Sequence, residues 1–181
     1  MKKIIGVSLI LSCFSLGAKA QATSAANQNV ALSLSNAIAI TFVATGSAVG
    51  SSVSIPFSSV ADYTNGVQSG AQQMMVQSNK PFNITMNANA ANFTYSGSTT
   101  PSPTMGVSNV LSCMVVSNGT GGTVSSYFTG FYPITSTAQT IISSCTSGGN
   151  QLFSCMYKGM PNYSFPAGTY TTNVIYTATQ P

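Results

Sequence analysis

The sequence has almost no charged residues and lacks several side chains on which catalysis depends. Among its 181 residues, five are Lys or Arg, one is acidic, and there is no His or Trp. Glu and Arg are also absent, so Asp62 is the sole acid. Glycoside hydrolysis usually needs two carboxylates, and a Ser or Cys nucleophile usually needs a His base. We therefore predict that the chain is not an enzyme.

The same scarcity argues against metals, cofactors and nucleic acids as ligands. Common metal sites need clusters of His, Cys or carboxylates, and the cysteines show no Cys-x-x-Cys spacing. The formal net charge of +4 includes three lysines in the first twenty residues; without them, Lys80 and Lys158 against Asp62 leave +1. Phosphate binding takes several clustered cations. We expect no metal, no cofactor and no nucleic-acid partner.

Residues 1–20 have the pattern of a secretory signal peptide. Lysines at 2–3 precede a largely apolar run over 4–16, and an Ala-x-Ala motif ends at Ala20. The run is too short to span ~30 Å of hydrocarbon comfortably. We predict export to the cell surface or the extracellular space, with the periplasm as the alternative, and no transmembrane segment in the mature chain. A lipoprotein-type cleavage that leaves Cys13 acylated is the other alternative.

The composition predicts strands rather than helices. Hydrophobic residues make up 44% of the chain, and the polar ones are mainly Ser, Thr, Asn and Gln with many Gly. No apolar pattern of helical period is sustained, whereas short alternating segments are separated by turn signals. We predict an all-β fold, an immunoglobulin-like two-sheet antiparallel β-sandwich of about seven to nine strands. A flexible leader at 21–28 would precede a single domain at 29–181.

The first alternating segment follows this leader. Its apolar residues all fall on even positions: Val30, Leu32, Leu34, Ile38, Ile40 and Phe42. Such alternation is typical of a strand with one buried face. The segment either pairs within its own sheet or is donated to the sheet of a neighbouring subunit, a known mode of β-strand addition.

The last alternating segment begins at a Pro-Ala-Gly turn and runs almost to the end of the chain. A strand in this position must find hydrogen-bond partners in its own sheet or in another molecule. We expect one continuous strand that opens with Gly168 and carries on one face Tyr170, Thr172, Val174, Tyr176 and Ala178.

This ending resembles that of two groups of exported β-sandwiches. Chaperone–usher pilins and spore-coat-U-like secreted pilins end in a strand that opens with a glycine fourteenth from the end, as Gly168 does here. Their penultimate aromatic is replaced by Gln180, and the nearest aromatic is Tyr176. The resemblance implies a subunit that assembles by strand donation, with 30–42 as donor and 168–178 bordering the acceptor groove.

Two further resemblances concern the ending and the chain as a whole. Its Pro-Ala-Gly-Thr-Tyr run is similar to the end of the cell-wall-binding WxL domain of Gram-positive surface proteins, although the chain has no Trp. The whole sequence also resembles small exported proteins of unassigned role from the Bacteroidetes group. Both likenesses imply export and a β fold.

Three cysteines remain after the predicted cleavage: Cys113, Cys145 and Cys155. An odd number in an oxidising compartment leaves one thiol over when one disulfide forms. We predict Cys145–Cys155, across the hairpin expected between their segments, with Cys145 in its loop. Cys113–Cys155, which would join two strands, is the alternative.

An aromatic cluster is the candidate ligand site. It comprises Tyr127, Phe128, Phe131 and Tyr132, which either form an exposed stacking patch or close the end of the core. Two functions from different classes result. The first is a structural or adhesion-type surface protein whose partners are like subunits or another surface protein. The alternative is a module that binds glycan or peptidoglycan through the aromatic patch. A secreted monomer whose first strand stays in its own sheet is the third reading.

Overall fold

The computed structural model describes residue 26 and residues 28–43 and 52–181. The predicted signal peptide, with Cys13, and most of the leader lie outside these residues. The chain divides into two units, residues 1–34 and 35–181. In the first unit, residues 28–34 have no regular secondary structure, and Val30, Leu32 and Leu34 are 74%, 85% and 89% exposed. Among the described residues, no helix is long and apolar enough to cross a membrane.

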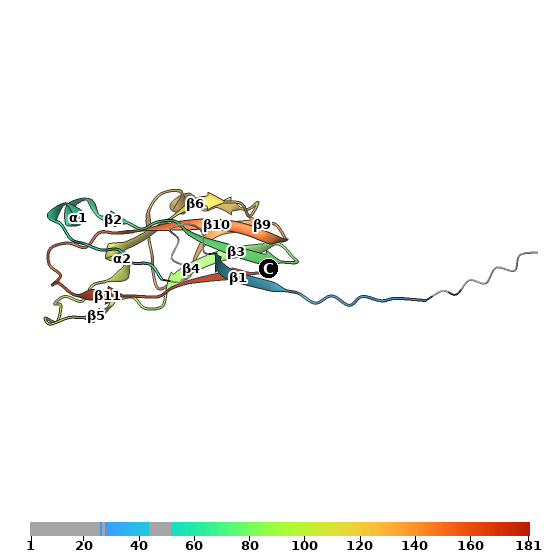
Figure 1. Ribbon diagram of the computed structural model, residues 1–181, viewed down its shortest axis with the longest axis horizontal. Coiled ribbons are helices and arrows are strands. Elements are labelled where there is room, and N and C mark those ends of the chain that lie inside the picture. Colours follow the sequence, from blue (N-terminus) through green and yellow to red (C-terminus); the bar gives the residue numbers. More distant parts are fainter. Residues whose placement is uncertain (1–25, 27, 44–51) are drawn as a thin grey trace, which may run out of the picture. The chain divides into compact units, whose positions relative to one another are not determined.

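The second unit is an antiparallel β-sandwich, which confirms the all-β, two-sheet prediction (Figure 1). One sheet has the order β1-β3-β10-β6-β8, with β2 also paired to β10; the other has the order β12-β4-β9-β7. The strands of the first sheet are β1 (Ile38–Val43), β2 (Val67–Gln68), β3 (Gln72–Ser78), β6 (Leu111–Asn118), β8 (Tyr132–Pro133) and β10 (Gly148–Gly159). Those of the second are β4 (Phe82–Ala88), β7 (Thr123–Val124), β9 (Gln139–Cys145) and β12 (Val174–Thr179).

Smaller elements complete the fold. Strands β5 (Thr94–Ser96) and β11 (Thr169–Thr171) form a two-stranded ribbon, and the helices are α1 (Val60–Asn65), α2 (Val107–Val110) and the 3₁₀ turn η1 (Ser126–Thr129). The described chain thus has twelve strands rather than seven to nine. The excess comes from β2, β5, β7, β8 and β11, which are only two or three residues long and carry little alternation for a sequence pattern to reveal.

Alternation explains the core between the two sheets. In β4, every second side chain from Phe82 to Ala88 is at most 1% exposed, and the residues between them are partly exposed. Strand β3 shows the same alternation, with Met74 and Val76 buried. A period of two places successive side chains on opposite faces of a sheet, so these strands present one apolar face to the core.

The last segment is two strands instead of one. Strand β11 pairs with β5, whereas β12 pairs with β4 in the four-stranded sheet. The chain changes partner at Thr172 and Asn173, whose hydroxyl and backbone N–H both donate to the Asn89 side-chain oxygen, at 3.1 and 2.9 Å. The predicted alternation of the segment persists through this break, because Tyr170, Val174 and Tyr176 are all partly buried.

The first alternating segment also divides. Residues 38–43 form β1 and pair with residues 73–78 of β3, within the chain's own sheet. Residues 30–34 carry the same alternation but are exposed and unassigned to any strand. The single segment predicted over residues 30–42 therefore consists of an edge strand and an exposed extension.

Candidate functional site

A groove lies between β1 and β12, the first and last strands of the sandwich. Strands β1 and β12 are the outermost strands of their sheets and contact each other along one side, where the rings of Phe42 and Tyr176 meet edge to face with centroids 6.4 Å apart. Between them lies a cavity of about 320 Å³ lined by Ile40, Thr41, Phe42, Met74, Val174, Ile175 and Tyr176. Most of these side chains are apolar, so the groove opens part of the core to solvent.

Tyr176 ties the groove to the interior. Its ring also packs against Phe153, at 6.1 Å between centroids, and its hydroxyl lies 2.8 Å from that of Tyr157 and 3.9 Å from the Cys113 sulfur. Burial raises the pKa of both Tyr176 and Tyr157. Both phenols therefore stay protonated at neutral pH and act as a hydrogen-bonded pair rather than as acid or base.

Strand β1 covers the groove only incompletely. Ile38 and Phe42 of β1 are 37% and 43% exposed, although they share the even-numbered face that turns toward the core. In β3, the neighbouring strand, the corresponding face is buried, with Met74 at 1%. The sandwich is therefore closed less completely along β1 and β12 than in its centre.

Strands β1 and β12 lack the features that commonly protect a sheet edge from pairing with another chain. Strands β1 and β12 are six residues long, and neither contains a charged residue or a proline. On the other side, β7 and β8 have two residues each, and β8 contains Pro133. Proteins commonly protect sheet edges with Lys, Pro or very short strands, because an open edge can pair with another chain.

The sole acid serves a structural purpose. The Asp62 carboxylate accepts hydrogen bonds from the backbone N–H groups of Ser58 and Ser59, at 2.8 and 2.7 Å, while the Ser59 hydroxyl accepts from the Asp62 N–H. This is a capping box at the start of α1. The backbone bonds lower the pKa of Asp62. No group of three or more His, Cys, Asp or Glu that could hold a metal occurs in the described part of the chain.

All three described cysteines are free and buried. The predicted pair Cys145–Cys155 is not formed, because the chain between β9 and β10 crosses from one sheet to the other and makes no hairpin. Cys145 is the register partner of Phe82 at the start of β4, whereas Cys155 is the partner of Gln72 at the start of β3, so the two cysteines lie at different levels along the sandwich. Cys145 also ends β9 instead of lying in a loop, and its sulfur accepts a hydrogen bond from the Thr120 hydroxyl at 3.3 Å.

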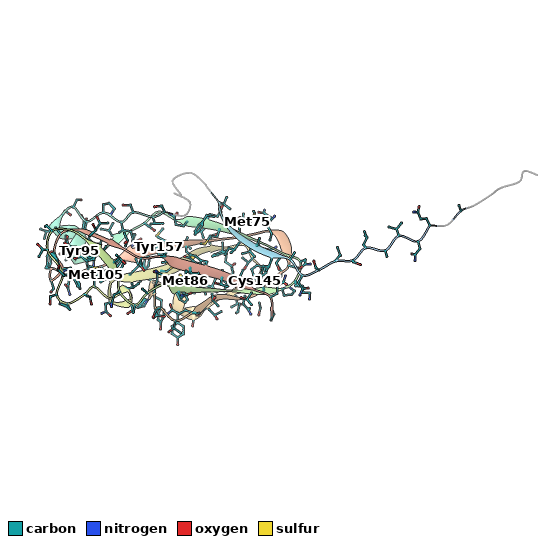
Figure 2. The ribbon with its side chains drawn as sticks, turned by 90° about the horizontal axis from the view of Figure 1, so that it is seen from below. Met75, Met86, Tyr95, Met105, Cys145 and Tyr157 are labelled. Carbon is teal, nitrogen blue, oxygen red and sulfur yellow. The ribbon has the colours of Figure 1, made fainter. Side chains whose placement is uncertain are left out.

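Cys155 instead neighbours Cys113, the alternative partner from the sequence, but this disulfide is not formed either. Strands β10 and β6 are adjacent, and Tyr157, two residues from Cys155, is the register partner of Cys113. A hydrogen bond with Cys113, together with burial, raises the pKa of the Cys155 thiol. Figure 2 shows Cys145 well separated from Tyr157 along the sandwich. The two thiols are thus part of the buried polar cluster beneath the groove.

The predicted aromatic patch is only partly at the surface. Phe128 is 1% exposed and belongs to the core, Phe131 and Tyr132 are partly buried, and Tyr127 is 64% exposed. Tyr127 and Tyr132 pack with centroids 4.8 Å apart. The segment therefore closes the core, as one of the two readings expected, and offers one exposed ring to a ligand.

Gly168 lets its backbone lie close to the Tyr95 ring. This contact is at the end of the sandwich away from the C-terminus, where β5 and β11 lie (Figure 1). A Cβ at this position would overlap the Tyr95 ring and come within 2.9 Å of the Ser96 carbonyl oxygen. Tyr95 in turn packs on Tyr170, 4.8 Å between centroids, and donates to the Ala167 carbonyl. The glycine is therefore required by the packing of the ribbon.

Sequence reasoning missed two polar residues beside the groove. The side chains of Asn79 and Gln180 hold the backbone just before β1. Nothing in their local sequence marks this role, because both contacts join residues that are far apart in the chain. The C-terminus and the start of β1 lie next to each other in Figure 1.

Comparison with known proteins assigns no family to this arrangement: no protein-family model matches the chain, and no curated protein matches it either.

Proposed function

We propose that this chain is an exported, non-enzymatic structural subunit of a surface assembly, and that its copies join by β-strand addition. Residues 28–34 of one copy would enter the groove between β1 and β12 of the next. The segment expected from the sequence thus has two roles. Residues 30–34 are donated to the next copy, whereas β1 remains paired within its own chain and borders the acceptor groove together with β12.

The observation that carries the proposal is the exposed alternation of the extension. Val30, Leu32 and Leu34 are 74–89% exposed, and they occupy every second position of a segment that contains no charge. Isolated apolar residues at a surface are ordinary, but an alternating set is typical of a strand that buries one face. In these described residues the alternating face is uncovered, so a partner would stabilise it.

The groove matches this segment in chemistry. The donor side chains span about 14 Å at about 3.4 Å per residue, and β12, with six residues, is long enough to pair with them. Val174 and Tyr176 line the groove with the same spacing of two residues. Burial of each donor side chain contributes roughly 1.5–3 kcal/mol. Backbone hydrogen bonds to the open edges of β1 and β12 would add to this.

Other features support a structural role and export. The sole carboxylate is used in a helix cap, which leaves no acid–base pair for hydrolysis. Residues 1–20 have the pattern of a signal peptide, and the surface polarity of the remainder comes from Ser, Thr, Asn and Gln.

The test is the solution mass of purified residues 21–181 over a concentration series. The wild-type chain should form a ladder of regular oligomers. Leu32→Asp/Leu34→Asp should shift the concentration for half-assembly at least about 100-fold upward, because ~2.7 kcal/mol of donor burial is lost. Both leucines are exposed in the described chain, so the monomer should fold unchanged.

Val60→Asp/Tyr127→Asp is the matched control. It places the same two charges on residues that are also exposed, at 74% and 64%, but that lie outside the extension and the groove. The control should assemble like the wild type. A wild-type chain that remains monomeric at every concentration, or an equal loss in both variants, would show that the extension does not mediate assembly.

A further inference from the structure

An amide clamp holds the backbone immediately before β1. The Asn79 side chain accepts a hydrogen bond from Ala37 N–H at 2.9 Å and donates to the Ser35 carbonyl at 2.8 Å. The Asn79 backbone N–H donates to the Ala37 carbonyl at 3.2 Å. Both backbone polar groups of Ala37 are thereby occupied by one residue. The chain is consequently held extended from residue 35 into β1.

The C-terminal end of the chain completes the clamp. The Gln180 side-chain amide lies within 2.9–3.2 Å of three acceptors: the Ala37 carbonyl, the Ser78 hydroxyl and the Asn79 side-chain oxygen. Ser78 is 6% exposed and is the register partner of Ile38, the first residue of β1. The clamp therefore joins the start of β1, the end of β3 and the residue after β12.

From this geometry we infer that Asn79 and Gln180 prevent the extension from filling the groove of its own chain. The inference rests on the proposed strand addition, because it concerns what keeps the groove free for another copy. Residues 28–34 immediately precede β1, which borders the groove. To lie along β1 of the same chain, they must reverse direction between residues 34 and 38. A hairpin of this kind uses a loop of two to five residues, and residues 35–37 are the ones available.

The clamp and this hairpin are mutually exclusive. A tight turn at residues 35–37 requires their backbone to leave the extended conformation, which breaks the bonds that Ser35 and Ala37 make to Asn79. Self-filling would compete with assembly at an advantage, since the donor is tethered and its effective concentration is high. Asn79 and Gln180 are positioning residues that remove this advantage and leave the groove to another copy.

The test is a double-mutant cycle on residues 21–181, read by denaturant unfolding of the monomer at low concentration and by solution mass at high concentration. One change is Asn79→Ala/Gln180→Ala, and the other is Leu32→Asp/Leu34→Asp. With the clamp intact, the leucine changes should leave the midpoint of monomer unfolding unaltered. Without the clamp, the extension fills its own groove, so the same changes should lower the midpoint clearly, and oligomers should fall at least tenfold relative to the wild type.

Asn89→Ala is the matched control, because Asn89 also uses its side-chain oxygen to hold a strand end, through Asn173 N–H at 2.9 Å. In this background, the leucine changes should not affect the monomer. Equal effects of the leucine changes with and without the clamp would overturn the inference, even if the wild type assembles. A wild type that never assembles would refute strand addition between copies, yet the monomer cycle would still report whether the clamp restrains the extension.

Discussion

The two lateral sides of the sandwich differ in how their sheets end. On one side, β1 and β12 present six residues each, uncharged and without proline, on either side of an apolar groove. On the other side, β7 and β8 have two residues each, Pro133 interrupts the second, and η1 with buried Phe128 packs against β6 nearby. Both sides belong to one core, so the overall need for burial does not explain the difference.

We call the β7–β8 side the finished side and the β1–β12 side the unfinished side. Short strands and proline leave little backbone for another chain to pair with, and a covering aromatic excludes water from the core. Among the described residues, β1 and β12 are neither very short nor interrupted by proline, and Phe42 above the groove is 43% exposed. An open edge of this kind is what the proposed strand addition requires.

The largest expected effect comes from placing a charge in the unfinished side. Phe42→Lys should raise the concentration for half-assembly about 100-fold, because an ammonium group in the groove must be desolvated when a donor strand covers it. The monomer should lose about 1–2 kcal/mol, since Phe42 is only partly buried. Solution mass and denaturant unfolding measure the two quantities.

Tyr127→Lys makes the same change on the finished side. Its ring is exposed and packs on Tyr132 near β8. We expect assembly to remain within about twofold of the wild type, a free-energy change of ~0.4 kcal/mol. If the two lysines weaken assembly equally, the difference between the sides has no bearing on assembly.

A second prediction concerns the interior of the unfinished side at alkaline pH. An unfolded tyrosine loses its proton near pH 10, whereas burial raises the pKa of folded Tyr176 and Tyr157 above that value. Below pH 10 both tyrosines are protonated in the folded and the unfolded state, so they make their full contribution to stability. As pH rises past 10, only the unfolded state releases protons, so the free energy of unfolding falls by up to ~1.4 kcal/mol per pH unit for each group.

Tyr176→Phe tests this because it keeps the ring that contacts Phe42 and Phe153. Loss of the 2.8 Å hydroxyl pair should cost about 1 kcal/mol at neutral pH. The fall in stability between pH 10 and 11 should also become shallower than in the wild type. An unaltered slope in Tyr176→Phe would mean that this phenol ionises in the folded protein as readily as in the unfolded one.

The sequence predicts the sandwich better than it predicts the groove. Alternation from Phe82 to Ala88 reports which face of β4 is buried, because period and burial are local properties of a strand. Sheet membership is not local: β9 and β10 are consecutive, yet they belong to different sheets, and the predicted Cys145–Cys155 pair was wrong for this reason. The alternation at residues 30–42 likewise does not reveal that pairing begins at Ile38.

The contacts beside the groove were beyond sequence reasoning for a similar cause. Asn79 and Gln180 are ordinary polar residues in a chain rich in Asn and Gln, and their role arises when residues about a hundred positions apart meet. The sequence also does not show which rings of the aromatic segment face solvent, because this depends on the packing that buries Phe128 in the core. What the sequence does establish for the candidate site is the apolar, uncharged character of the extension and of the last strand.

The smallest expected effect comes from removing the proline on the finished side. Pro133→Thr gives β8 a backbone N–H at an exposed position and a residue that favours strands. If proline alone protected this edge, the variant should assemble in a new way, through β8. We expect no change beyond about twofold, or ~0.4 kcal/mol, because β8 has only two residues and so offers few hydrogen bonds to a partner. Solution mass, measured with Leu32→Asp/Leu34→Asp in the same chain, isolates any assembly through this edge. Oligomers in that triple variant would show that proline, rather than the shortness of β8, keeps this side closed.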